Sequence, residues 1–215
     1  MTYDRQLDIL DPSVIFYPVT LIGCGGIGSP TSLVLAKMGC SDITLMDADE
    51  VEEHNLPNQL FRLTDIDSKK VVACQAILQE FSTCSVRIIP EMFNGTQDLS
   101  GIVISGVDNM AARQTIWEKV KYNLDIPLYI DARLGGEVVQ VFTIQPCQIE
   151  DIELYEKHLF LDEEAEILPC TARAIMYTGF VVAGLIASQS KKWLKNEFLY
   201  HYISLDLKTM TNVLQ

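Results

Sequence analysis

The residues best suited to chemistry begin with a glycine-rich run, Gly23-Cys24-Gly25-Gly26-Ile27-Gly28, followed about 20 residues later by Asp47. In a βαβ unit with this spacing, Gly23 turns the chain tightly, Gly25 lets the backbone approach a phosphate, and Gly28 permits close helix packing. A phosphate there would meet the free N–H groups and positive dipole end of the next helix. The pattern predicts a nucleotide site that includes Gly26; a glycine-rich turn without a ligand is the alternative.

The elements that position these residues alternate between strand and helix. Hydrophobic patterning predicts strands at residues 19–22, 43–46, 86–92, 102–105, 128–132 and 137–144, and helices at about 29–38, 69–81 and 110–123. An apolar helix ending near Lys195 and two short strands, 200–207 and 210–214, complete the chain. This order predicts an α/β fold: a doubly wound, mostly parallel, Rossmann-like sheet with antiparallel strands toward the C-terminal end. Ligands of such sheets bind at the carboxyl ends of the strands, where Gly23, Asp47 and Asp108 fall.

Composition restricts the class of protein. A chain of 215 residues with 48% hydrophobic residues predicts one globular domain. A net charge of −13 opposes binding to nucleic acid or to an anionic membrane. A polar N-terminus and an apolar run of about 14 residues, too short to cross a bilayer, predict a soluble, cytoplasmic protein. Six scattered cysteines without a C-x-x-C pair favour reduced thiols.

Six short motifs occur in a fixed order along the chain. They are Tyr3-Asp4-Arg5-Gln6, the glycine loop 23–28, Asp47-Ala48-Asp49-Glu50-Val51, Asn55-Leu56 with Gln59, Lys70 within residues 65–71, and Asp108-Asn109-Met110-Ala111-Ala112-Arg113. In this order they resemble the ThiF/MoeB/HesA branch of the ubiquitin-activating enzyme superfamily. The resemblance extends over nearly the whole chain and implies a single adenylation domain, residues 1–215. Such proteins use ATP and Mg²⁺ to adenylate a C-terminal carboxylate, usually of a small ubiquitin-like or sulfur-carrier protein, and are usually homodimers.

The resemblance implies a role for each residue type. Asp47 is expected at the ribose hydroxyls, with Asp49 either near the same pocket or acting as a cap. Lys70 and Arg5 are expected to hold phosphate oxygens and to stabilise the leaving pyrophosphate. Asn55 would add a neutral hydrogen bond. Asp108 is the expected magnesium ligand, because Mg²⁺ prefers one or two carboxylates together with phosphate oxygens.

Three departures from the family pattern bear on this interpretation. Asn58 stands where relatives commonly have a phosphate-binding arginine, so the sequence predicts replacement by Arg62, reliance on Lys70 and Arg5, or reduced activity. Cys147 lacks the partners of a structural zinc site, so no such zinc is expected. Asp67 replaces a glycine just before the phosphate lysine and is expected to alter the local turn.

Cys170 is the candidate nucleophile. It stands where relatives place a cysteine that accepts the carrier, and a cysteine that opens a helix can have a lowered pKa. A covalent role and a buried structural thiol are both compatible with the sequence. The acid-rich stretch between residues 148 and 167 is interpreted as a solvated segment or, alternatively, as a docking face for a basic partner.

The resulting hypothesis is an enzyme, a ThiF/MoeB-type adenylyltransferase that forms an acyl-adenylate with release of pyrophosphate, followed or not by transfer to Cys170. A catalytically weak or inactive scaffold subunit of the same fold is the alternative suggested by Asn58. An NAD-dependent oxidoreductase would leave Arg5, Lys70 and Asp108 without a function. Activation of a peptide or a modified nucleoside is a further alternative.

Overall fold

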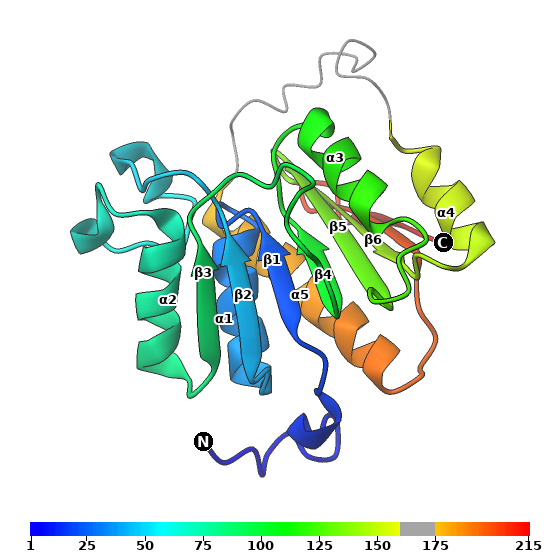
Figure 1. Ribbon diagram of the computed structural model, residues 1–215, viewed down its shortest axis with the longest axis horizontal. Coiled ribbons are helices and arrows are strands. Elements are labelled where there is room, and N and C mark those ends of the chain that lie inside the picture. Colours follow the sequence, from blue (N-terminus) through cyan, green and yellow to red (C-terminus); the bar gives the residue numbers. More distant parts are fainter. Residues whose placement is uncertain (160–174) are drawn as a thin grey trace.

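One eight-stranded sheet organises the chain in the computed structural model, which describes residues 1–159 and 175–215 (Figure 1). The strand order is β3-β2-β1-β4-β5-β6-β7-β8. The parallel strands are β1 (Val19–Ile22), β2 (Asp42–Met46), β3 (Ser85–Ile89), β4 (Ile102–Ser105) and β5 (Leu128–Gly135); β6 (Val138–Ile144), β7 (Tyr202–Asp206) and β8 (Thr211–Leu214) are antiparallel. The predicted fold class is therefore confirmed.

Helices cover both faces of the sheet and form two hydrophobic cores. On one face α1 (Gly28–Met38), α2 (Lys70–Phe81) and α5 (Met176–Leu194) pack on side chains such as Leu21 and Ile104. On the other, α3 (Met110–Val120) and α4 (Ile149–Glu156) pack on Val103 and Tyr129. The helices change face between β1 and β4, which are neighbours in the sheet. That change of face marks the place where such sheets bind ligands.

Several element boundaries differ from the sequence predictions for local reasons. β3 ends at Ile89 because Pro90 has no N–H to donate. β5 continues past Ala132 to Gly135, since it forms a hairpin with β6 through Gly136, whose φ is +61°. α3 ends at Val120, and Tyr122 follows with a φ of +60°. Three short 3-10 helices, Pro12–Val14, Glu53–Asn55 and Leu63–Asp65, lie outside the predicted strands and helices.

Within the part of the chain that the structure describes, no helix is both long enough and apolar enough to cross a membrane. Cys170 and the acidic residues 162–166 lie outside the described residues.

Candidate functional site

The crevice between β1 and β4 is built from closely approaching backbones. Gly23 follows β1 with a φ of +91°, and a Cβ atom on it would lie 2.8 Å from the carbonyl oxygen of Gly106, which follows β4. A Cβ on Gly106 would lie 3.0 Å from Ile27. Only glycine fits at Gly23, because both its conformation and its neighbour exclude a side chain.

The glycine loop leads into α1 as the sequence predicted. A Cβ on Gly28 would lie 1.8 Å from the Gly23 carbonyl oxygen, so this glycine is required for close packing. Gly25 has more space: the nearest atom to a Cβ there is Nε2 of Gln59 at 3.8 Å. The N-cap residue Ile27 provides no side-chain cap, and the first turn of α1 contains no acidic residue. The Ser29 N–H already donates to the Gly25 carbonyl and Pro30 has no N–H, so the helix N-terminus offers an anion chiefly the positive end of its dipole.

A second helix holds the other side of the loop. A Cβ on Gly179, in the first turn of α5, would lie 2.6 Å from the carbonyl oxygen of Gly26. This contact fixes the glycine loop against α5, a helix more than 150 residues away in the sequence.

Asp47 lies directly after β2 and touches the glycine loop. Its Oδ2 accepts a hydrogen bond from the Cys24 backbone N–H at 2.7 Å, and its Oδ1 accepts one from the Asp49 N–H at 2.8 Å. Burial raises the pKa of this carboxyl above its ordinary value, against the opposing effect of the two backbone hydrogen bonds. Each oxygen retains a second lone pair, so the carboxylate is able to accept ribose hydroxyls while it orders the loop.

Lys70 and Asp49 form an ion pair beside Asp47. Lys70 is the first residue of α2 and is only 8% exposed, and its Nζ lies 2.7 Å from Oδ2 of Asp49. The Lys70 backbone N–H also donates to the Asp49 carbonyl at 3.0 Å. Asp67, two residues before Lys69, has a φ of +66°, the left-handed conformation that a glycine adopts most easily, so the expected alteration of this turn does not occur. The structure thus gathers Asp47, Asp49 and Lys70 at one end of the sheet.

The segment that contains Asn55 and Asn58 crosses the glycine loop. Asn55 is buried, and its Oδ1 accepts the Glu52 N–H at 2.9 Å, so its carboxamide holds a short helix in place. The Leu60 N–H donates to Ser29 Oγ at 3.0 Å, which ties this segment to α1. Oδ1 of Asn58 and Oε1 of Gln59 are buried without a hydrogen-bond partner in the described part of the chain.

Arg62, the predicted replacement for the cation missing at Asn58, is paired with two carboxylates. Its guanidinium pairs with Asp65 at 2.9 Å and with Glu80.

Arg5 lies far from the other candidates within one chain. Its neighbour Gln6 donates to the Met38 carbonyl at the end of α1, and Tyr3 lies against Gly39, the C-cap of that helix. The glycine loop is at the opposite end of α1, and an 11-residue helix is roughly 16 Å long. Figure 1 shows the N-terminal segment below the sheet, at the ends where the parallel strands begin. The structure therefore does not bring Arg5 together with Lys70.

Asp108 lies on the other side of the crevice, in the loop between β4 and α3, and is exposed. Asn109 donates from Nδ2 to Asp108 Oδ1 at 3.0 Å and accepts the Ala112 N–H at 2.8 Å as the N-cap of α3. Oxygen atoms of Asp108 remain for a hard cation, which fits Mg²⁺. Within residues 1–159 and 175–215, no three or more acidic, histidine or cysteine residues lie close enough together to bind a metal ion by themselves. A magnesium ion here would need phosphate oxygens as its other ligands.

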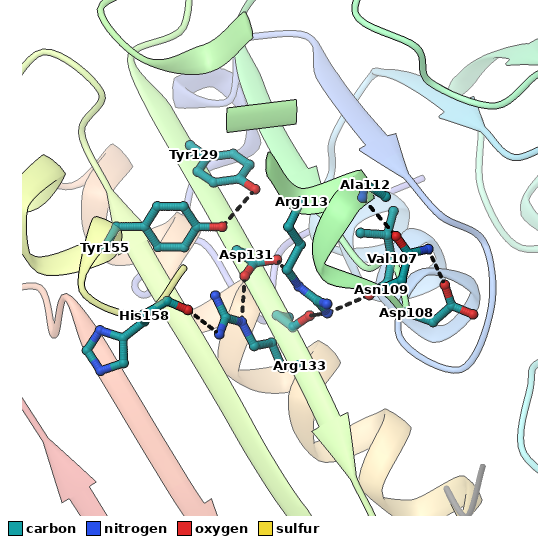
Figure 2. Close-up of polar contacts among 11 residues, drawn as sticks. Val107, Asp108, Asn109, Ala112, Arg113, Tyr129, Asp131, Arg133, Tyr155 and His158 are labelled. Atoms are coloured by element: carbon teal, nitrogen blue, oxygen red, sulfur yellow. Dashed lines mark hydrogen bonds and ion pairs between the residues drawn. The ribbon is translucent and has the colours of Figure 1, made fainter. Parts of the chain in front are cut away.

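A buried carboxylate that the sequence analysis did not identify lies behind Asp108 (Figure 2). Asp131, on β5, is fully buried and pairs with Arg113 of α3 at 3.2 Å and with Arg133 at 2.9 Å. The sequence contained one indication of this ion pair, because an acidic residue in the middle of an apolar strand requires a buried partner for its charge.

Comparison with known proteins places the chain in a family. The model of the ThiF family matches residues 15–214. The chain belongs to the ThiF family. It is 34% identical over 148 residues to the sulfur carrier protein ThiS adenylyltransferase of Escherichia coli (strain K12), a match that covers 65% of this chain and 57% of that one. It is 36% identical over 107 residues to the Nedd8-activating enzyme E1 catalytic subunit of Drosophila melanogaster, covering 46% of this chain and 23% of the relative.

Solved structures agree on the fold. E. coli MccB, in a crystal structure with ATP, superposes with a TM-score of 0.73 at 22% identity, covering 95% of this chain and 65% of that one. PaaA gives a TM-score of 0.73 at 18% identity, with coverage of 95% and 65%. This ThiF-family chain thus spans less than two thirds of the length of these relatives.

Proposed function

We propose that residues 1–215 act as a single ATP-dependent adenylation domain. The substrate would be the C-terminal carboxylate of a small ubiquitin-like or sulfur-carrier protein, and the products an acyl-adenylate and pyrophosphate. The observation that supports this most directly is the arrangement at the β1–β4 crevice: the glycine loop, Asp47 and Lys70 on one side and Asp108 on the other. The names of the curated relatives, among them a ThiS adenylyltransferase, agree with it.

The reaction is a substitution at the α-phosphorus of ATP. A carboxylate oxygen of the substrate forms a bond to that phosphorus, the bond to the bridging oxygen breaks, and pyrophosphate leaves with the electron pair. The protein's task is alignment and charge neutralisation. The glycine loop and the N-terminus of α1 would bind phosphate oxygens, and Asp47 would hold the ribose.

Lys70 and Asp108 would neutralise the triphosphate. Lys70 would exchange Asp49 for phosphate oxygens, with Asp49 keeping the ammonium in position until the nucleotide arrives. Asp108 and phosphate oxygens would hold Mg²⁺, which when bound supplies positive charge at the leaving group. Asn55 would act by keeping the segment above the loop in shape.

Arg5 would act in a second copy of the chain. Its distance from the crevice of its own chain means that it reaches phosphates only if a homodimer places it over the partner's site. A role for Arg5 at the phosphates therefore requires the predicted homodimer. Mixing an Arg5→Ala protein with a Lys70→Met protein tests it, because a mixed dimer regains one complete site. Restored exchange of pyrophosphate is expected, whereas two inactive proteins that stay inactive together would contradict this role.

Cys170 would receive the activated carboxylate as a thioester in a second step, with AMP as the leaving group. A Cys170→Ser protein should still adenylate the carrier but should fail to transfer it. Intact downstream transfer by the serine variant would reject the covalent role and leave adenylation unaffected.

The proposal is tested by ATP–pyrophosphate exchange. Small proteins ending in Gly-Gly are supplied as substrates, together with the same proteins amidated at the C-terminus and with short peptides. We expect exchange that requires a free C-terminal carboxylate and is lost in Asp108→Ala. If no C-terminal tail supports ATP–pyrophosphate exchange, the proposal is overturned. Tight ATP binding without exchange would support the scaffold alternative instead.

A further inference from the structure

A buried network connects the loop that contains Asp108 with the end of α4. It consists of Arg113 on α3 and of Asp131 and Arg133 on β5 (Figure 2). None of the three lies in the glycine-loop half of the site.

Asp131 is the centre of this network. It is fully buried, its Oδ1 accepts from Arg113 Nε at 3.2 Å, and its Oδ2 accepts from Arg133 Nε at 2.9 Å. A carboxylate without water requires both its oxygens to be satisfied and its charge to be paired. Two guanidinium groups on two different elements provide this, so Asp131 fixes α3 relative to β5.

Arg113 transmits this constraint to the metal-binding loop. Its Nη2 donates to the Val107 carbonyl oxygen and, at 3.4 Å, to that of Ala132. Val107 immediately precedes Asp108. The loop is thereby held from two sides: by Arg113 at Val107, and by the Asn109 cap, which also contacts the Asp108 carboxylate.

Arg133 completes the support from the other end. Its Nη1 donates to the His158 carbonyl at 2.9 Å, and its guanidinium lies 4.5 Å from the ring centre of Phe142. The planar fork is fixed by these contacts, so it presents Nε to Asp131 in one geometry.

We propose that Asp131 is a positioning residue for metal-dependent catalysis: through Arg113 and Val107 it orients the Asp108 carboxylate toward the triphosphate. This inference rests on the proposed function, in which Asp108 holds Mg²⁺. Asp131 itself touches neither nucleotide nor substrate. Its loss should therefore loosen the Asp108 loop and weaken Mg²⁺ use, while the affinity for ATP without metal stays unchanged.

The test compares Asp131→Asn with Asp151→Asn. Asp151 is a matched control: it is also buried, accepts the Gln145 N–H at 2.7 Å, and pairs with His201 at 3.0 Å, but it lies on α4. Hydrogen–deuterium exchange is measured on the protein without nucleotide. The Ala112 and Arg113 amides should exchange about tenfold faster in Asp131→Asn and at the wild-type rate in Asp151→Asn.

A second measurement follows the metal. The Mg²⁺ concentration for half-maximal pyrophosphate exchange should rise about tenfold in Asp131→Asn, with metal-free ATP binding unchanged. Unchanged amide exchange, or the same acceleration in Asp151→Asn, would overturn the proposal. If Asp131→Asn does not fold, Arg113→Lys replaces it, since a lysine keeps the charge but loses the fork that reaches Val107.

The two proposals fail in distinguishable ways. Hydrogen–deuterium exchange of the free protein needs no substrate. It therefore tests the role of Asp131 even if no C-terminal carboxylate supports ATP–pyrophosphate exchange. In that case Mg²⁺-dependent ATP binding provides the second measurement.

Discussion

The Asp49–Lys70 ion pair predicts that removal of an acidic residue from the candidate site strengthens ATP binding. Asp49 was a candidate for nucleotide binding, yet its carboxylate neutralises the lysine expected to bind phosphates. We expect Asp49→Asn to bind ATP more tightly than the wild-type protein, because ATP then no longer competes with an internal anion for Lys70.

The size of the effect follows from the exposure of the two partners. The Lys70 side chain is 9% exposed but that of Asp49 is 65% exposed, so solvent screens the pair and it is worth about 1 kcal/mol or less. The substitution also removes the repulsion between the Asp49 carboxylate and the nearby triphosphate, which adds a further contribution of less than about 1 kcal/mol. Together these favour binding by about 1.4 kcal/mol, which is about tenfold in Kd.

The assay is a titration of ATP by calorimetry, with and without Mg²⁺, alongside thermal unfolding. Without nucleotide, Asp49→Asn should be less stable by about 1 kcal/mol, because the Lys70 ammonium stays buried without its anion. The rise in Tm that ATP produces should accordingly be larger in this variant than in wild type.

Glu50→Gln is the matched control. Glu50 is the next residue, is similarly exposed, and pairs with Lys69 at 3.2 Å, so the variant changes the net charge equally without touching Lys70. Its Kd should stay within about twofold of wild type. Weaker ATP binding by Asp49→Asn would refute the reasoning.

Two further predictions concern the backbone and pH. Gly28→Ala should destabilise the fold by about 3 kcal/mol or more in denaturant titrations, because its Cβ would overlap the Gly23 carbonyl, whereas Gly25→Ala should fold normally and lose ATP affinity. Equal stabilities of the two variants would contradict this packing argument. The hydrogen bond that the protonated His201 ring donates to the Asp151 carboxylate raises the pKa of His201, so the folded state holds this proton more tightly than the unfolded chain does. The stability from this pair should be complete below about pH 6.5 and should be lost as pH rises through the higher folded-state pKa, by about 0.5 to 1 kcal/mol. His201→Gln should remove that part of the pH dependence of Tm between pH 6 and 8; an unchanged slope would count against it.

The glycine half of the site was predictable from sequence because its chemistry is local. Gly23, Gly28 and Asp47 belong to one βαβ unit, and the fold of that unit follows from the spacing of its residues. Lys70 was predictable only through the resemblance, yet it occupies the expected end of the sheet. For the residues of the βαβ unit, a short separation along the chain determines the distance in space.

The positions of the other site residues depend on contacts between segments that are distant in the sequence. Arg5 precedes the first residue of β1, Val19, by 14 positions, and no local pattern shows that its segment lies against the far end of α1. Asp131 pairs with Arg113 across two elements 18 residues apart, which depends on how α3 packs on β5. Asp49 was recognised as an acid near the pocket, but its partner depended on the docking of α2. Long-range packing decided these positions.

The meeting of three backbones at the glycine loop also affects how the sequence can evolve. Gly23, Gly106 and Gly179 come from widely separated parts of the chain, yet a Cβ atom on each would lie within 3.0 Å of another segment's main chain or of Ile27. Gly106 and Gly179 lie outside the six motifs that carry the family resemblance. Descendants of this chain that lose the recognisable Asp and Lys motifs should nevertheless keep a small residue at these two positions, which makes them markers of common ancestry after the active-site chemistry has diverged.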